Sequence, residues 1–153
     1  MTPNIAYCSL IVMSGIVITL SVSCPTVLGD SNAFLKNFVN HEFLNILGVV
    51  LAITVASAAQ LHLTFNQIEE RFKKRGFSKA RSGVQQAAYW LIGLFLVSVV
   101  LVVAKPLLAC DYEWAQSLFN GAALLILLWY VLVLIALTQG VFAIKSHISE
   151  NDT

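Results

Sequence analysis

The chain alternates four long apolar runs with shorter polar segments. The runs occupy residues 5–22, 43–63, 87–104 and 118–144. A helix needs roughly 20 mainly apolar residues to cross the hydrocarbon core of a bilayer, and each run is close to that length. The pattern therefore predicts an all-α, multi-pass membrane protein with four transmembrane helices, which form a single domain over residues 1–153.

The second helix is expected to continue beyond the membrane. Phe65, Ile68 and Phe72 follow its apolar run at spacings of three and four residues, which keeps one helical face apolar. A helix over residues 43–74 would be about 48 Å long at 1.5 Å per residue. We expect its last three turns to form a cytoplasmic stalk that ends at Gly76, and the segment FSKARSG to link back to the third span.

The first polar segment is expected to contain a short helix of its own. Its apolar residues, Phe34, Leu35, Phe38 and Val39, occur in adjacent pairs four positions apart, as on one face of a helix. Ser31 or Asn32 can cap its N-terminus. Such a helix can lie in the membrane interface.

Composition supports a membrane protein, and charge predicts its orientation. Hydrophobic residues make up 58% of the chain and charged residues only 11%, against about 25% charged in soluble domains. Cytoplasmic loops carry an excess of Lys and Arg. Seven basic residues lie between spans two and three or after span four, and two lie in the other loops: Arg71, Lys73, Lys74, Arg75, Lys79, Arg81 and Lys145 against Lys36 and Lys105.

We therefore expect the 64–86 segment and both termini to be cytoplasmic, and loops near 23–42 and 105–117 to lie outside. No basic residue precedes Lys36, so the first run lacks the basic region of a signal peptide and is expected to be retained.

Polar and small residues share one side of the second helix. At about 100° per residue they fall within about a third of its circumference: Asn45, Gly48, Ala52, Ala56, Ala59, Gln60, Asn66 and Gln67. Leu44, Leu47, Leu51 and Leu61 take the opposite side. Small residues let another helix of the same chain approach closely. Alternatively, the polar end faces an oligomer axis or a water-filled vestibule.

His62 lies beside this stripe and is interpreted as a helix-interface residue. A transmembrane haem usually has two axial ligands, and His41 and His147 are expected at opposite membrane edges. We therefore expect no cofactor and no metal site.

The three cysteines leave two arrangements open. Cys24 and Cys110 are expected on the same, oxidising side, where they can form a disulfide or remain separate thiols, while Cys8 is expected to stay reduced. No C-x-x-C motif is present, which argues against a disulfide oxidoreductase.

The basic segment has an ordinary interpretation and a more specific one. Excess Lys and Arg in a cytoplasmic loop is typical of topology signals and of contact with anionic lipid. The same residues, Arg71, Lys73, Lys74, Arg75, Lys79 and Arg81, can instead contact a cytoplasmic regulatory protein or another anionic ligand. No sequence-specific nucleic acid is expected as a partner.

No Asp, Glu, Lys or Arg occurs inside the four apolar runs. Pumps and most ion-coupled transporters carry such residues as relays, so these classes are disfavoured. The few histidines and loop acids do not assemble a recognisable catalytic arrangement, and we do not expect an enzyme.

The layout of a long second helix ending LHLTFNQIEERFKKRG, a linker and a third span resembles the small membrane effectors of anti-phage abortive-infection systems. The lambda exclusion protein Rex B and the membrane subunits of the Kiwa and Hailong systems share this layout. The resemblance implies a homo-oligomer in the inner membrane that perturbs ion permeability when a signal releases it.

These observations lead to one expected function and two alternatives. The expected function is an oligomeric effector that forms or gates a pore, with helix two near the symmetry axis. The first alternative is a non-conducting anchor or scaffold for a cytoplasmic partner. The second is a phage holin.

Overall fold

The computed structural model describes residues 3–72, 78–109 and 112–150, and all regular elements among them are helices. These are α1 (Pro3–Ser23), α2 (Pro25–Leu28), α3 (Ala33–Phe38), α4 (His41–Phe72), α5 (Ser78–Leu108) and α6 (Glu113–Glu150). Four of them contain segments long and apolar enough to cross a membrane: Ala6–Ser23, His41–Gln67, Arg81–Leu108 and Glu113–Gln139. The expected all-α fold with four such helices is confirmed.

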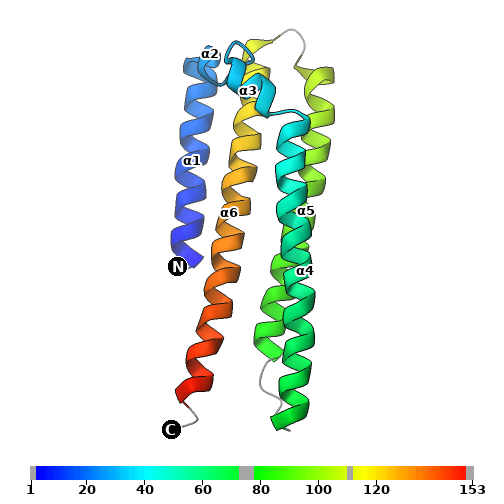
Figure 1. Ribbon diagram of the computed structural model, residues 1–153. Coiled ribbons are helices and arrows are strands. Elements are labelled where there is room, and N and C mark those ends of the chain that lie inside the picture. The colour runs from blue at the N-terminus through cyan, green and yellow to red at the C-terminus, as the bar shows by residue number, and fades with distance from the viewer. Residues whose placement is uncertain (1–2, 73–77, 110–111, 151–153) are drawn as a thin grey trace.

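The long helices run alongside one another and alternate in direction (Figure 1). The short helices α2 and α3 lie at the same end as the end of α5 and the start of α6. We call this the α2–α3 end. The start of α5 and the ends of α4 and α6 lie toward the opposite end. Both predicted outer loops therefore fall at one end of the molecule.

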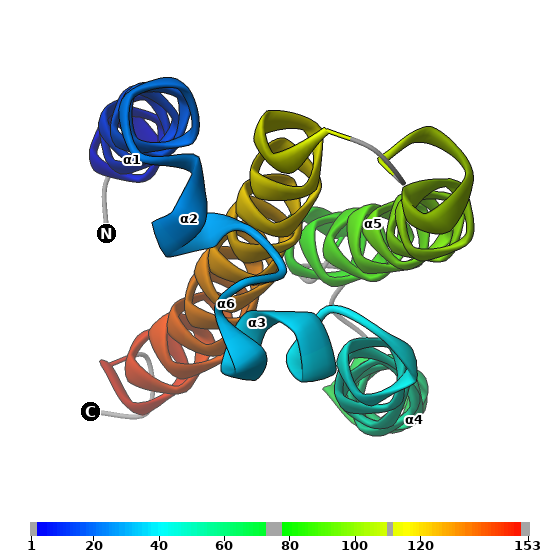
Figure 2. The ribbon, with the colours of Figure 1, turned by 90° about the horizontal axis from the view of Figure 1, so that it is seen from above.

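Helix α6 links α1 and α2 to the pair formed by α4 and α5. It packs against α5 and also against α1 and α2, while α5 packs against α4. Seen from above, α1 lies on the other side of α6 from α4 and α5 (Figure 2). Helix α1 is thus attached to the other long helices mainly through α6.

The larger core lies where α4, α5 and α6 meet. Phe43 and Leu47 of α4, Leu91 of α5, and Ala123 and Tyr130 of α6 are almost completely buried in it. The Tyr130 hydroxyl donates a hydrogen bond to the Leu47 carbonyl oxygen, with an O–O distance of 3.2 Å. The one polar atom of this large side chain is thereby paired within an apolar environment.

Helix α1 approaches α6 closely because α6 has a glycine at the contact. A Cβ atom at Gly121 would collide with the side chain of Val17, and the Ser21 hydroxyl lies beside the same position. Val17 belongs to a second buried cluster with Leu28 and Leu35. Small residues at such contacts let transmembrane helices pack backbone to backbone.

Much of the apolar surface stays uncovered. Ile11 and Val22 of α1 and Val100 of α5 are 72%, 74% and 67% exposed. Soluble monomers rarely expose contiguous apolar patches larger than a few hundred Å². Lipid tails are the solvent that fits these faces.

The short helix in the first loop is confirmed, and its N-cap is identified. The Asn32 side chain accepts a hydrogen bond from the Phe34 backbone amide at 3.1 Å, so Asn32 rather than Ser31 is the cap. Leu35 and Val39 turn inward, whereas Phe34 is exposed.

Both boundaries of α5 differ from expectation. Helix α5 already begins at Ser78, so most of the segment predicted as a linker is helical. The same helix continues through Lys105 and Pro106 to Leu108, which shortens the predicted outer loop. Proline has no backbone N–H to donate to the carbonyl oxygen four residues earlier, and α5 ends two residues after Pro106.

Candidate functional site

Helix α4 has one face that packs inside the chain and one that does not. Phe43, Leu47, Thr54 and Phe65 are buried. The outward face consists of Asn45, Ala52, Ala56, Ala59, Gln60 and Gln67, all of them exposed. No helix in the described part of the chain covers these residues. We call the six of them the α4 polar face.

Two residues of the predicted stripe have contacts inside the chain instead. A Cβ atom at Gly48 would lie 3.6 Å from Cε2 of Phe95 on α5, so Gly48 faces α5. Asn66 is half-buried. His62 is exposed beside the α4 polar face.

Asn66 and Glu69 hold α4 to α5 through an arginine. The Nη2 atom of Arg81 donates to Oδ1 of Asn66 at 2.6 Å and to Oε2 of Glu69 at 3.2 Å. Arg81 is one of the residues predicted to contact a cytoplasmic partner or an anionic ligand, and it also has these contacts within the chain. Lys73, Lys74 and Arg75 lie outside the described residues, as do the side chains of Arg71 and Lys79.

The predicted cysteine pair stays a prediction. Cys8 and Cys24 are exposed free thiols, but Cys110 lies outside the described residues.

A polar network at the α2–α3 end was not anticipated from the sequence. Lys105 Nζ lies 2.7 Å from Oδ1 of Asp30, and their side chains are 10% and 24% exposed. Asn120 is fully buried. Its Nδ2 donates to the Leu28 carbonyl oxygen at 2.7 Å and to Oδ1 of Asp30 at 3.1 Å. The network joins the loop before α3 to both α5 and α6.

The Asp30 carboxylate is kept ionised by its neighbours. Burial raises the pKa of Asp30, but hydrogen bonds from Lys105 and Asn120 and the positive charges of Lys105 and Lys36 lower it by more. The net result is a pKa below the ordinary value of 3.8. The ion pair therefore persists at neutral pH.

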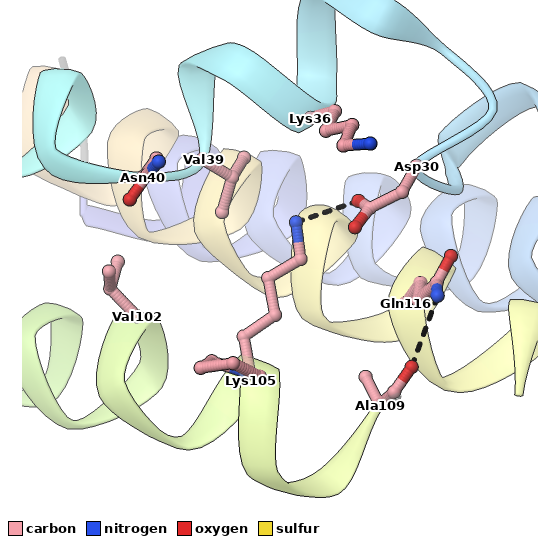
Figure 3. Close-up of a pocket in the computed structure, with 9 residues that line it drawn as sticks. Asp30, Lys36, Val39, Asn40, Val102, Lys105, Ala109 and Gln116 are labelled. Atoms are coloured by element: carbon pink, nitrogen blue, oxygen red, sulfur yellow. Dashed lines mark hydrogen bonds and ion pairs between the residues drawn. The ribbon is translucent and has the colours of Figure 1, made fainter. Parts of the chain in front are cut away.

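A pocket of about 350 Å³ opens beside this network (Figure 3). Its lining comes from the first loop and from α5 and α6, and comprises Asp30, Lys36, Val39, Asn40, Val102, Lys105, Pro106, Ala109 and Gln116. The Gln116 side chain closes one wall by donating to the Ala109 carbonyl oxygen at 3.1 Å.

Three buried polar atoms near this end have no hydrogen-bond partner within the described part of the chain: the Ser21 hydroxyl, the Ser117 hydroxyl and Oδ1 of Asn120.

One sequence signal pointed to this region. Asn120 is a strongly polar residue inside the fourth apolar run, and such residues usually face the interior of a membrane protein.

Among the described residues, no group of three or more His, Cys, Asp or Glu side chains is placed to hold a metal ion.

Comparison with family models, curated proteins and solved structures found no match to this chain. The α4 polar face and the pocket at the α2–α3 end are the candidate functional sites of this chain.

Proposed function

We propose that this protein is an oligomeric effector of the bacterial inner membrane in which copies of α4 line a pore and control its permeability. The observation that carries the proposal is the α4 polar face. It places the amides of Asn45, Gln60 and Gln67 on the outside of a membrane-spanning helix.

Gln60 lies deepest of the three within the span His41–Gln67, and its amide needs polar surroundings that lipid does not provide. An amide without a hydrogen-bond partner costs roughly 4–8 kcal/mol in a hydrocarbon environment. A second copy of α4, or a column of water enclosed by several copies, supplies partners. Ala52 and Ala56 lie between the amides on the same face and allow two helices to approach closely.

The proposed mechanism uses uncharged lining and an apolar closure. Gln60 and Gln67 stabilise water in the open pore. Val49 and Leu63, also exposed on α4, form separate apolar constrictions that close by dewetting. The controlling signal reaches the pore through the stalk and the basic segment, on the cytoplasmic side. A role in phage defence rests on the resemblance in layout alone.

A second candidate is a membrane anchor without conduction. It is favoured by the length of α4, which continues as a regular helix to Phe72, beyond the apolar span that ends at Gln67. Such an extension is a natural surface for a soluble partner.

Controlled expression in a bacterial host with a membrane-potential dye distinguishes the two functions. We expect the wild-type chain to depolarise the cells and Gln60→Leu to reduce the effect severalfold, because leucine removes polar lining. Gln86→Leu is the matched control, since Gln86 is exposed on α5 and should retain wild-type flux. Depolarisation that is equally strong in both variants would contradict a pore lined by α4.

If all three proteins are expressed equally and none depolarises the cells, the anchor becomes the better account. Its own test is charge reversal at Lys73, Lys74 and Arg75, which should release a bound cytoplasmic partner.

A further inference from the structure

The pocket at the α2–α3 end combines positive charge with an apolar wall. Lys36 and Lys105 face it from different elements, and Val102 and Pro106 supply apolar surface. Figure 3 shows the Lys105 side chain extending along the pocket to Asp30, with Lys36 on the far side of the same carboxylate.

The described lining carries one more positive charge than negative. Asp30 is the single carboxylate among these residues, and Lys105 already pairs with it at 2.7 Å. Lys36 forms no ion pair within the described part of the chain. The local excess of one positive charge matches a ligand with one negative charge.

The position of the pocket indicates where that ligand comes from. Its lining residues lie at the ends of the membrane-spanning segments: Asn40 directly precedes the α4 span, and Lys105 and Pro106 fall in the last turn of the α5 span. Tyr112 and Trp114 pack against each other at the same end, with ring centroids 6.2 Å apart. Such aromatic residues are typical of the headgroup level of a bilayer.

We propose that this pocket binds a phosphate group, and specifically the singly charged phosphodiester of an anionic phospholipid headgroup. Lys36 supplies the unpaired charge, and lysine binds phosphate as a point charge. The exposed amide of Asn40 can donate to a second phosphate oxygen. The acyl chains continue along the uncovered surface of α5, where Val103 and Leu107 are 60% and 78% exposed.

The test uses the full-length chain in detergent and native mass spectrometry to count bound lipids. Three ligands are compared: phosphatidylglycerol, phosphatidylcholine, which has the same phosphodiester but no net charge, and inorganic phosphate. We expect one phosphatidylglycerol to bind the wild-type chain at least several times more tightly than phosphatidylcholine. Lys36→Gln should weaken phosphatidylglycerol binding about fivefold, because each basic residue near an anionic lipid surface contributes roughly 1 kcal/mol.

Asn40→Asp provides a sharper variant with a matched control. It cancels the excess positive charge in the pocket without disturbing the pair of Asp30 and Lys105, and it should weaken phosphatidylglycerol binding about fivefold or more. Asn37→Asp adds the same charge at an exposed position of α3 outside the lining, and should bind lipid nearly as the wild type does.

The outcomes separate the sources of the phosphate. Inorganic phosphate that binds alone with the same dependence on Lys36 and Asn40 would support the phosphate site but assign it to the free ion. Equal affinity of phosphatidylglycerol for the Asn40→Asp and Asn37→Asp chains would overturn the proposal. So would the absence of any bound lipid or phosphate on a folded wild-type chain.

Discussion

At the scale of single residues, the ion pair of Asp30 and Lys105 shows how opposing effects decide a charge state. Desolvation disfavours an ionised carboxylate, and burial is the largest single effect on Asp30. The hydrogen bonds from Lys105 and Asn120, together with the two lysine charges, outweigh it. Removing one partner leaves the other charge partly buried and unpaired, which costs more than the pair itself contributes.

Asp30→Asn should therefore lower the free energy of unfolding by about 1–3 kcal/mol at pH 7. The variant preserves shape but leaves the Lys105 ammonium, whose side chain is 10% exposed, without a counter-charge. Glu42→Gln is the control, because Glu42 is exposed at the same end, and it should change stability by no more than about 0.5 kcal/mol. Denaturant unfolding in detergent measures both.

The same comparison has a defined pH dependence. The pKa of Asp30 is lowered in the folded chain, so its contribution to stability is complete above the unfolded pKa, about 3.9, and is lost as the pH falls through the folded pKa. The difference between wild type and Asp30→Asn should stay constant from about pH 7 to 5 and shrink below about pH 4. A difference that already disappears near pH 6 would show that another group is responsible.

At the scale of elements, the contact of α1 with α6 depends on a missing side chain. Gly121 receives Val17 where a Cβ atom would collide with it. The sequence did not reveal this contact, because lipid-facing and partner-facing residues of α1 are equally apolar. The two faces of α4 were easier to predict. Asn45, Gln60 and Gln67 interrupt an apolar helix, whereas Leu44, Leu47 and Leu51 pack inward.

Gly121→Ala should destabilise the fold by about 1–3 kcal/mol through overpacking against Val17. Gly93→Ala is the matched control: no atom lies within 4 Å of a Cβ atom placed there, so it should be neutral or slightly stabilising through helix propensity. Both are measured by unfolding in detergent. Adding Val17→Ala to Gly121→Ala should recover part of the loss, and an unchanged Gly121→Ala chain would contradict the close contact.

At the scale of the whole molecule, the hydrophobic pattern predicted four membrane-spanning helices and the short interfacial helix α3. It did not predict the network of Asp30, Lys105 and Asn120. Asp30 lies 75 positions from Lys105 and 90 positions from Asn120 in the sequence. Local patterns do not report which distant polar residues meet. No helix in the described part of the chain packs on the α4 polar face. In the proposed oligomer, other copies of α4 cover it.

Cysteine cross-linking in native membranes tests this central claim most directly. In a chain with Cys8, Cys24 and Cys110 replaced by serine, Ala56→Cys places a thiol on the α4 polar face, and Leu96→Cys places one on an exposed apolar position of α5. We predict that oxidation gives a disulfide-linked dimer with Ala56→Cys and little with Leu96→Cys. If the Ala56→Cys chain remained entirely monomeric after oxidation, an interface formed by α4 would be contradicted. Equal cross-linking at both positions would contradict it as well.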